Sequence, residues 1–482
     1  MWAPFHFDDY AIFADPYLTA PSGAWEVWRW EQTRPLTYFT FWLNYAIGAE
    51  SAIGYHALSL TIHIVSSLLL FACLRRLMPE RAALIGSALF AIHPIQAEPV
   101  IYIFARAILL ATLLCLVSLH LWLRGRHWWA VLAFLGALLA KEEAVAFPLF
   151  LFLLYLSISR NSRELRPIGA MLLLSVGLGL RVLFATKSVQ GAGFNAGISA
   201  IDYFLTQGVA IWRYVQLLVV PIGFTVDPEI APPPVWLGLL GWLAIAGLAV
   251  LSLKRFSKAR EGFWLIGGLI LLMPSSSILP AIDVAADRRM YLPLIALAGV
   301  TGLVLQRIRT AYVAVIAVGL TVLSIARTQV WLSERTLWAE AVDRSPGKVR
   351  PLIQLARVSG PEEALELMGR AEKLAPDDAL VASEEGRVFL ESGLPAESLS
   401  AFGRALALDP GSARALNNRG TALLALDQRD AAKSDFERAL KVDPCLFEAR
   451  RNLLRMGVDV GPLPPACRLP SHQVKELSDL KP

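Results

Sequence analysis

The sequence predicts an all-α protein, a polytopic transmembrane helical bundle followed by an α-solenoid of tetratricopeptide repeats. Hydrophobic residues make up 55% of the 482 residues and the mean hydropathy is +0.51. A soluble domain carries more charge than the 18% found here. Apolar stretches close to the roughly 20 residues that one membrane crossing needs fill the chain up to about Gln329. A repeat with a period of 34 residues follows them.

The chain divides into four expected regions. Residues 1–52 form a first extracytoplasmic loop with an acidic motif, and residues 53–328 form the bundle. Residues 329–456 form the repeat module. Residues 457–482 are a proline-rich tail that we expect to be disordered or loosely packed.

Charge and cysteine content narrow the class of protein. The formal net charge is +5, and the basic residues flank apolar segments instead of forming one patch. This pattern favours a membrane over nucleic acid as the partner. The cysteines lack the spacing of metal ligands, and Cys445 and Cys467 can pair only in an oxidising compartment.

Seven apolar stretches are candidate crossings, and three shorter ones accompany them. We interpret Trp128–Ser157 as a helical hairpin and not as one long helix, and Asp202–Phe224 as a re-entrant or interfacial helix. The seven candidates are Ile53–Leu77, Pro99–Leu123, Pro167–Thr186, Val235–Leu253, Gly262–Leu279, Met290–Leu305 and Thr310–Ala326. The shorter stretches are Ala82–Ala91, Trp128–Ala140 and Ala144–Ser157.

Five basic clusters set the orientation, because short loops rich in Lys and Arg stay on the cytoplasmic side. The first loop, the turns His93–Glu98 and Lys141–Glu143, the segments 188–200, 227–234 and 283–289, and the repeats then lie on the extracytoplasmic side. An exported first loop normally follows a membrane helix, so we expect the natural chain to begin upstream of Met1. Unaided export of a short tail is the alternative. The clusters are Arg75-Arg76 with Arg81, Arg124 with Arg126, Arg160 with Arg163 and Arg166, Lys254-Arg255 with Lys258 and Arg260, and Arg307 with Arg309.

The repeat period is visible in three prolines, Pro376, Pro410 and Pro444, each 34 residues after the one before. Pro346 ends a degenerate first unit. Small residues at matching positions let paired helices approach closely, and each proline ends a second helix. Such arrays bind extended peptides or partner proteins in a groove, and we prefer this role to that of a spacer.

Charged side chains near a membrane core usually mark a site or a buried pair. Asp8 and Asp9 are adjacent acids in an aromatic setting; one carboxylate can accept a proton from a nucleophilic hydroxyl while the other tunes it. An isolated Asp-Asp pair is more often a solvated turn, so the catalytic assignment depends on the other charged groups expected nearby. Further charged or polar groups are expected on the same side, namely His93, Glu98, Arg106, Lys141, Glu142, Arg288 and Arg289. Together with Asp8 and Asp9 they predict an outward-facing cavity with acids at its rim and cations for a phosphate.

Six segments, followed by the repeats, carry a resemblance to a known family: FHFDDY, RPLTYFTFWLNY, GYHALSLTIHI, LFAIHPIQAEPVIYIFARAILLA, AKEEA and AADRRMYLP. In these segments the chain resembles the transmembrane O-mannosyltransferases that carry tetratricopeptide repeats, within the C-type glycosyltransferase superfamily. The resemblance covers nearly the whole chain. The chain departs from the family pattern in its short repeat array and in the absence of the family's first transmembrane helix.

The resemblance implies an integral protein of the bacterial inner membrane or the endoplasmic reticulum, with its active site on the periplasmic or lumenal side. It implies transfer of a sugar, such as the hexose mannose, from a polyprenyl-phosphate carrier to a protein or peptide hydroxyl. It implies Asp8 as general base with Asp9 assisting. The residues implied to bind the donor phosphate are Arg106, Lys141, Arg288 and Arg289, and those implied to orient them are His93, Glu98 and Glu142.

The expected reaction inverts the anomeric carbon, and the phosphate leaves with its charge held by Arg and Lys. No cofactor is required; a divalent metal between acids and phosphate is allowed, but no protein metal site is expected. Two other functions stay open. A lipid-linked oligosaccharide ligase or polymerase would use a large loop between late helices, whereas the longest outer loops here, 1–52 and 188–200, are early and central. A non-catalytic scaffold that displays the repeats would have no use for Arg106 and Lys141 at membrane depth.

Overall fold

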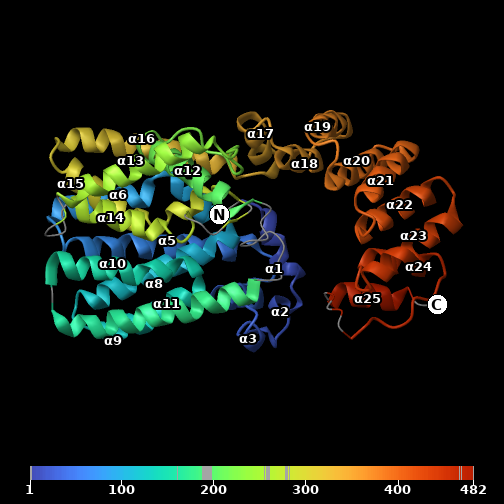
Figure 1. Cartoon of the computed structure of the whole chain (residues 1–482). Coiled ribbons are helices and arrows are strands. Elements are labelled where there is room, and N and C mark those ends of the chain that lie inside the picture. The colour runs from blue at the N-terminus through green and yellow to red at the C-terminus, as the bar shows by residue number, and fades with distance from the viewer. Residues whose placement is uncertain are drawn as a thin grey trace. The chain divides into compact units, whose positions relative to one another are not determined.

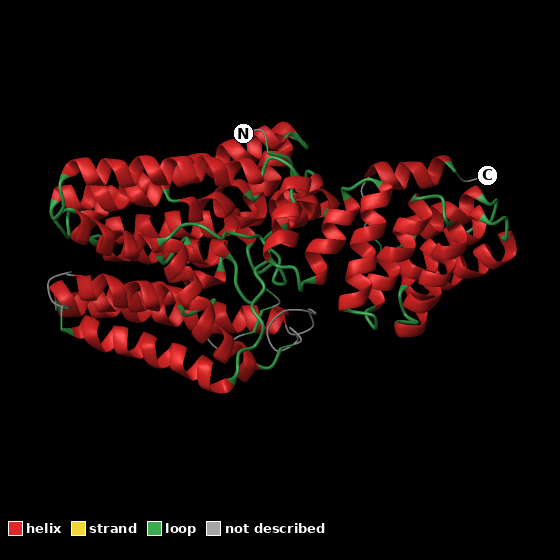
Figure 2. Ribbon diagram, turned by 90° about the horizontal axis from the view of Figure 1, so that it is seen from above, coloured by secondary structure: helices red, strands yellow, loops and turns green. Residues whose placement is uncertain are grey.

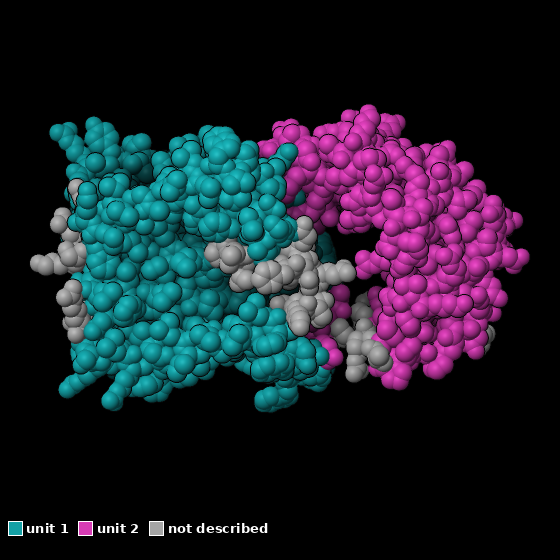
Figure 3. Space-filling view, viewed as in Figure 1, with its two compact units in different colours: residues 1–12, 20–332 teal, residues 13–19, 333–482 magenta. Residues whose placement is uncertain are grey.

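The structure is a computed structural model, and it describes residues 3–159, 161–186, 198–254, 256, 261–276, 280–281, 283–465, 467, 469 and 471–480. All regular elements in this part of the chain are helices (Figure 2). The chain forms two compact units, Met1–Ile12 with Ala20–Leu332 and Phe13–Thr19 with Ser333–Pro482 (Figure 3). The predicted fold class, a helical membrane region followed by a helical repeat solenoid, is confirmed.

Among the described residues of the first unit, five segments are helical, long and apolar enough to cross a membrane. A sixth crossing results if α6 (Glu80–Ile92) and the segment Pro94–Ile101, bent by 50°, form one broken span. Figure 1 shows the long helices of this unit running alongside one another. The five segments are α5 (Ala52–Leu74), Ile103–Trp122 with α8 (Arg106–Trp122), Ser162–Ala185 with most of α11 (Leu165–Thr186), α13 (Val235–Leu253) and α16 (Thr310–Val330).

Several predicted boundaries shift. Pro99–Leu123 is not one helix, because α7 (Ala97–Ile101) ends before an extended residue at Tyr102. Two expected crossings are shorter helices, α14 (Glu261–Leu272) and α15 (Leu294–Leu305). Most of the expected outer loop 188–200, together with Arg160, Arg255, Lys258, Arg260 and residues 277–279, lies outside the described residues.

The stretch Trp128–Ser157 consists of separate helices, as the hairpin interpretation requires. α9 (His127–Ala140) ends at Lys141, and α10 (Phe147–Leu154) follows a 3₁₀ turn. α12 (Ala200–Val219) covers most of the expected interfacial helix and is not among the candidate crossings. Both of its ends contact groups of predicted outer turns: Arg289 donates to the Tyr203 hydroxyl (3.1 Å), and His93 lies 3.2 Å from the Leu218 carbonyl oxygen. These contacts support the interfacial interpretation.

Basic clusters that lie far apart in sequence meet at one end of the bundle. Arg76 Nη1 donates to the Leu123 carbonyl beside Arg124 (3.1 Å), and Arg81 Nη2 donates to the Ile308 carbonyl between Arg307 and Arg309 (2.7 Å). Three of the five predicted clusters therefore share one end, as the orientation argument requires.

Glycine allows one helix pair of the bundle to pack with its backbones in close approach. A Cβ atom built on Gly86 of α6 would lie 2.2 Å from the Ala298 carbonyl oxygen of α15, and one on Gly302 of α15 would lie 2.2 Å from the Ala82 oxygen. No side chain fits in either place. This small-residue packing is typical of membrane helices.

The first loop folds into short helices. Five of them precede the first crossing: η1 (Phe7–Tyr10), α1 (Ala11–Ala14), α2 (Pro16–Thr19), α3 (Gly23–Glu26) and α4 (Pro35–Gly48). Arg181, in the last turns of α11, donates from Nη2 to the carbonyl oxygens of Trp30 (2.9 Å) and Gln32 (2.6 Å). The loop is thereby held at one end of a crossing.

The second unit is a solenoid of paired helices. Three of its second helices, α19 (Pro361–Leu374), α21 (Pro395–Leu408) and α23 (Arg429–Val442), each end two residues before one of the period prolines, as predicted. The paired first helices are α18 (Val349–Arg357), α20 (Ala379–Glu391) and α22 (Ala413–Ala425), preceded by α17 (Glu334–Arg344) and followed by α24 (Phe447–Arg455).

The expectation of a disordered or loosely packed tail is wrong for its helical part. α25 (Ser471–Asp479) buries Leu477 against Phe447 and Leu454 of α24. A disulfide joins Cys445 to Cys467, with the two Cα atoms 5.2 Å apart. This covalent link and the apolar contact together fix the tail on the last repeat.

Candidate active site

The adjacent acids of the first loop have different environments. Asp9 is fully buried, and its two carboxylate oxygens accept hydrogen bonds from the backbone N–H groups of His6 (2.9 Å) and Phe104 (2.7 Å). Asp8 is exposed, and its Oδ2 accepts a hydrogen bond from the Tyr102 hydroxyl (2.8 Å). The turn that separates them in this way requires Phe7 to adopt φ +47°, which is rare for a residue with a side chain. Of the two acids, only Asp8 is accessible to solvent.

Burial decides the protonation of the groups under this turn. Burial raises the pKa of Asp9 to about 7, although its two backbone hydrogen bonds act in the opposite direction. Burial likewise lowers the pKa of His6 to about 4, and its Nε2 lies 2.9 Å from the Trp331 carbonyl oxygen. Near neutral pH, His6 is therefore uncharged and Asp9 is partly protonated.

Arg288, from a segment far along the chain, lies beside Tyr102, the residue that donates a hydrogen bond to Asp8. Arg288 Nη1 donates to Glu98 Oε1 (2.7 Å) and its Nη2 donates to Asp283 Oδ2 (2.8 Å). Its guanidinium carbon also lies 5.8 Å from the centre of the Tyr102 ring. Tyr102 therefore contacts both the predicted base, Asp8, and a predicted phosphate-binding residue, Arg288. Glu98 lies where the sequence analysis expects it, in contact with that arginine.

A second ion pair lies beside this cluster, and the sequence analysis assigned it no role. Arg213 of α12 donates from Nη1 to Asp287 Oδ1 (2.8 Å). Within the described residues, Arg213 Nη2, Asp287 Oδ2 and Glu98 Oε2 are buried without a hydrogen-bond partner. An arginine in the middle of a largely apolar helix was the available signal.

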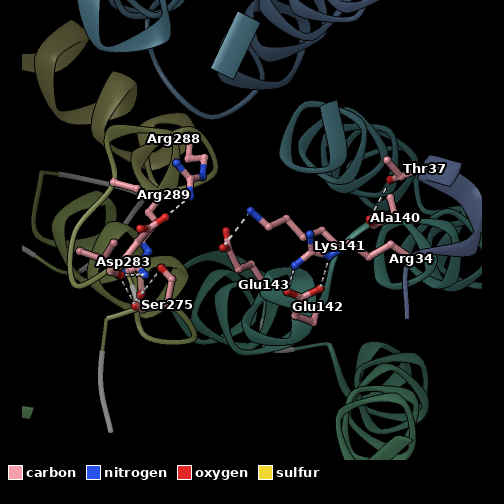
Figure 4. Close-up of polar contacts among 12 residues, drawn as sticks. Arg34, Thr37, Ala140, Lys141, Glu142, Glu143, Ser275, Asp283, Arg288 and Arg289 are labelled. Carbon is pink, nitrogen blue, oxygen red and sulfur yellow. Dashed lines mark hydrogen bonds and ion pairs between the residues drawn. The ribbon is translucent and has the colours of Figure 1, made fainter. Parts of the chain in front are cut away.

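The turn after α9 carries two ion pairs (Figure 4). Lys141 Nζ lies 2.9 Å from Glu143 Oε1, and Arg34 Nη2 lies 2.5 Å from Glu142 Oε1. Glu142 forms an ion pair with Arg34 of the first loop and also interacts electrostatically with Lys141, so its role in orienting Lys141 stays a prediction. Glu143 is close enough to Arg289 to interact with it electrostatically, so this turn faces the segment that carries Arg288.

Arg106, which we expect to bind the donor phosphate, lies among neutral hydrogen-bond partners. It is fully buried, and it donates to Asn44 Oδ1 (2.7 Å), the Tyr55 carbonyl (3.0 Å) and the Ser59 hydroxyl (3.3 Å). The Phe41 ring covers its guanidinium at 4.8 Å. Arg106 also lies within electrostatic reach of Asp9. Its hydrogen bonds link the first loop to α5, and its role as a phosphate-binding residue stays a prediction.

Arg289 and His93 also form hydrogen bonds within the protein. Arg289 donates to the carbonyl oxygens of Val284 (2.9 Å), Ser275 and Asp283, which holds its own loop. His93 accepts a hydrogen bond at Nδ1 from the Ile95 N–H (3.2 Å) and so caps a turn. Arg289 thus bonds mainly to backbone carbonyls and to the Tyr203 hydroxyl, and His93 contacts backbone groups. Binding of phosphate by Arg289 and orientation of cations by His93 stay predictions.

A metal ion does not fit the acids of this site. Within the described residues, no three His, Cys, Asp or Glu side chains lie close enough to hold one. The neighbours of Asp8 and Glu98 are a tyrosine hydroxyl and a guanidinium, which are hydrogen-bond donors and not metal ligands.

An apolar cavity of about 640 Å³ lies between α6, α12, α14, α15 and α16. His93 and Tyr214 line it. Tyr214 directly follows Arg213, and His93 begins the turn that ends at Glu98, so both are close in sequence to the charged cluster. The lining of the cavity begins at Met290 and then follows α15 from Leu294 to Leu305, a helix length of roughly 17 Å at 1.5 Å per residue. The cavity therefore extends from the level of Arg288–Arg289 toward the end of the bundle that carries Arg307.

Fold and site define a class, a polytopic helical membrane protein with a carboxylate–arginine cluster and a tetratricopeptide solenoid. A tetratricopeptide-repeat family model matches residues 413–444. Protein O-mannosyl-transferase F38B6.6 of Caenorhabditis elegans is 26% identical over 353 residues, which is 68% of this chain and 51% of that protein. Drosophila melanogaster protein O-mannosyl-transferase Tmtc1 is 35% identical over 133 residues, 26% of this chain and 15% of that one.

Human protein O-mannosyl-transferase TMTC4 is 29% identical over 232 residues, 42% of this chain and 30% of that protein. The chain thus spans about half the length of the first of these relatives and less of the others. The similarity fits the family of transmembrane O-mannosyltransferases with tetratricopeptide repeats, so the resemblance seen in the sequence motifs is confirmed.

Solved structures resemble this chain only weakly. The crystal structure of MamA is 16% identical and has a TM-score of 0.24, covering 30% of this chain and 81% of MamA. YrrB, described as a tetratricopeptide protein with an unusual peptide-binding site, is 18% identical with a TM-score of 0.22, covering 44% of this chain and 89% of YrrB. These scores are too low to support a functional conclusion.

Proposed function

We propose that this chain is a membrane glycosyltransferase that moves a hexose, mannose in the first instance, from a polyprenyl-phosphate carrier to a protein hydroxyl. The observation that carries the proposal is the shared contact of Asp8 and Arg288 with Tyr102. It brings an exposed carboxylate and a cation from distant segments to one place. The names of the relatives support the reaction class.

Asp8 is the proposed general base. Its carboxylate takes the proton of the acceptor hydroxyl while that oxygen forms a bond to the anomeric carbon. The bond from the anomeric carbon to the phosphate oxygen breaks on the opposite face, and the lipid phosphate leaves with the electron pair. The configuration at the anomeric carbon is therefore inverted. Asp9, buried and held by two backbone N–H groups, shapes the turn that presents Asp8.

Cations near Asp8 are proposed to receive the negative charge of the leaving phosphate. Arg288 is part-exposed, with 24% of its side-chain surface accessible. Lys141 lies in the turn that faces the segment carrying Arg288. Arg213, with one buried nitrogen that has no hydrogen-bond partner in the described residues, is a third candidate.

The apolar cavity supports a donor with a long hydrocarbon chain. Its lining begins at Met290, beside the charged cluster, and then follows α15 for roughly 17 Å. The lining is almost entirely apolar. A polyprenyl chain in it would place the attached phosphate at the level of Arg288. We assign the cavity to the donor because the cations lie at this end.

The active site and the repeats are proposed to lie on the extracytoplasmic side. The disulfide between Cys445 and Cys467 supports this side, because disulfides persist in oxidising compartments. The basic clusters that meet at one end of the bundle support it as well. The repeats are the proposed binding surface for a peptide acceptor.

The test is sugar transfer to peptide in membranes that contain the full chain and a polyprenyl-phosphate-linked mannose. Asp8→Asn should lower the rate by roughly 10²–10⁴-fold, as expected for loss of a general base. Glu31→Gln, at an exposed acid of the same loop, is the matched control and should keep the wild-type rate. Undiminished transfer by Asp8→Asn with Asp9→Asn would remove the proposal.

A further inference from the structure

Tyr102 lies where three segments of the first unit meet. It follows α7 in an extended conformation, and its own N–H donates to the Glu98 carbonyl (2.9 Å). Its side chain is buried, with 4% of its surface accessible. Only the hydroxyl end reaches the exposed acid Asp8.

The ring is clamped on several sides. The Trp331 ring stacks on it with centroids 6.3 Å apart and planes at 25°, and the Phe7 ring meets it edge-on at 5.5 Å. The Arg288 guanidinium lies 5.8 Å from its centroid. A ring fixed in this way can move little, so its hydroxyl is a fixed hydrogen-bond donor.

The hydroxyl selects one oxygen of the Asp8 carboxylate. It donates to Oδ2 at 2.8 Å, which leaves Oδ1 available to a substrate hydroxyl. Without this bond, the exposed carboxylate of Asp8 would be free to rotate about its side-chain torsions. A base that is held in one orientation meets its substrate at a smaller entropic cost.

We propose that Tyr102 is a positioning residue that fixes the base Asp8 relative to the phosphate-facing Arg288. The inference rests on the proposed sugar transfer and adds a residue to it. The hydroxyl acts on Asp8 and the ring contacts Arg288, so one side chain sets the spacing between the acceptor and donor ends of the site.

Tyr102→Phe tests the hydroxyl alone, since the ring and its contacts with Trp331, Phe7 and Arg288 are kept. We expect kcat to fall roughly tenfold while KM for the lipid donor stays unchanged. Tyr291→Phe is the matched control: it removes a buried hydroxyl that bonds to His63 Nδ1 (2.8 Å), and it should leave kcat unchanged. In an Asp8→Asn background, Tyr102→Phe should add little further loss, because its effect acts through Asp8.

A second measurement does not depend on activity. Water-soluble carbodiimide, applied to the full chain without donor, labels exposed carboxyl groups, and mass spectrometry reads the yield at Asp8. Tyr102→Phe frees Oδ2, so labelling of Asp8 should become several-fold faster, whereas Tyr291→Phe should not change it. Unchanged labelling and unchanged kcat in Tyr102→Phe overturn the inference and leave the proposed function standing.

Three further outcomes are decisive. A raised donor KM with unchanged kcat, or equal losses in the Asp8 and Asp8→Asn backgrounds, would make Tyr102 a packing residue and overturn the inference. If the wild-type protein transfers no sugar, the proposed function fails, and the labelling difference alone decides whether Tyr102 holds Asp8.

Discussion

Arg288 Nη1 lies 2.7 Å from Glu98 Oε1, and this contact joins two segments that are 190 residues apart in the sequence. Glu98 has 2% of its side-chain surface accessible, and Arg288 has 24%. The pair joins α7 to η9 (Asp287–Met290) within the first unit. Arg288 therefore holds the fold through this pair and keeps a partly exposed guanidinium, which is the group proposed to face the phosphate.

Removal of Arg288 should destabilise the protein strongly. Arg288→Met leaves the Glu98 carboxylate buried without its partner, which we expect to cost about 3–5 kcal/mol of the free energy of unfolding. Thermal unfolding of the purified protein in detergent measures this loss. The control is Glu98→Gln with Arg288→Met, which removes both charges and should recover part of the loss. If the double variant is no more stable than Arg288→Met, the result would contradict the cost assigned to the unpaired Glu98 carboxylate.

Asp9 should give the stability a pH dependence. Its pKa is about 7 in the folded protein and near 4 in an unfolded chain, so the folded protein holds the extra proton between these values. The stabilising contribution of Asp9 is complete below about pH 4 and is lost as the pH rises through 7. His6, whose pKa is lowered to about 4, has the opposite slope.

Asp9→Asn isolates this effect because His6 is common to both proteins. The free energy of unfolding of the wild type minus that of Asp9→Asn should decrease between pH 4 and pH 8. Unfolding temperatures measured over this range test the sign. A difference that stays constant, or that grows with pH, would contradict the buried and partly protonated state of Asp9.

Filling the apolar cavity should discriminate between donors by chain length. Leu297→Trp places a large side chain in the cavity, so KM for a long polyprenyl donor should rise several-fold. A donor with only two isoprene units should be used as before. Val315→Trp, at a residue of α16 that is 69% exposed, is the matched control and should affect neither donor. Equal effects on both donors would show that the chain binds elsewhere.

Close packing of α6 on α15 should be intolerant of a single methyl group. Gly302→Ala puts a Cβ atom 2.2 Å from the Ala82 carbonyl oxygen, so the helices must separate, and we expect a loss of about 1–3 kcal/mol. Gly319→Ala on α16, where nothing lies within 4 Å, should be neutral or slightly stabilising. Unfolding temperatures of the two variants give the comparison, and equal values would rule out the close helix crossing.

The repeat unit was the part most fully predicted from local sequence. Prolines with a period of 34 residues ended three helices at the expected places, because a proline blocks the helix wherever the chain goes. The tail was misjudged because its order depends on the contact of Leu477 with α24 and on the disulfide between Cys445 and Cys467. Composition does not encode such distant contacts.

The candidate site was predicted as a set of charges on one side, and the roles within the set were not predictable. The sequence analysis gave Arg106 and Arg288 the same role, since each is an arginine within or beside an apolar segment. Arg106 proved to be enclosed by Asn44, Tyr55 and Ser59, whereas Arg288 stays part-exposed beside Tyr102. Which neutral groups satisfy a buried cation depends on neighbours from other helices.

By itself the sequence determined the membrane character, the solenoid and the residue types of the site, because hydropathy, proline spacing and charge act through local chemistry. Only the tertiary structure decided that Asp8 is accessible and Asp9 is buried, and that Tyr102 lies between Asp8 and Arg288. The physical reason is that desolvation and hydrogen bonding depend on what surrounds a group in space. Residues adjacent in sequence, such as Asp8 and Asp9, can therefore meet opposite surroundings.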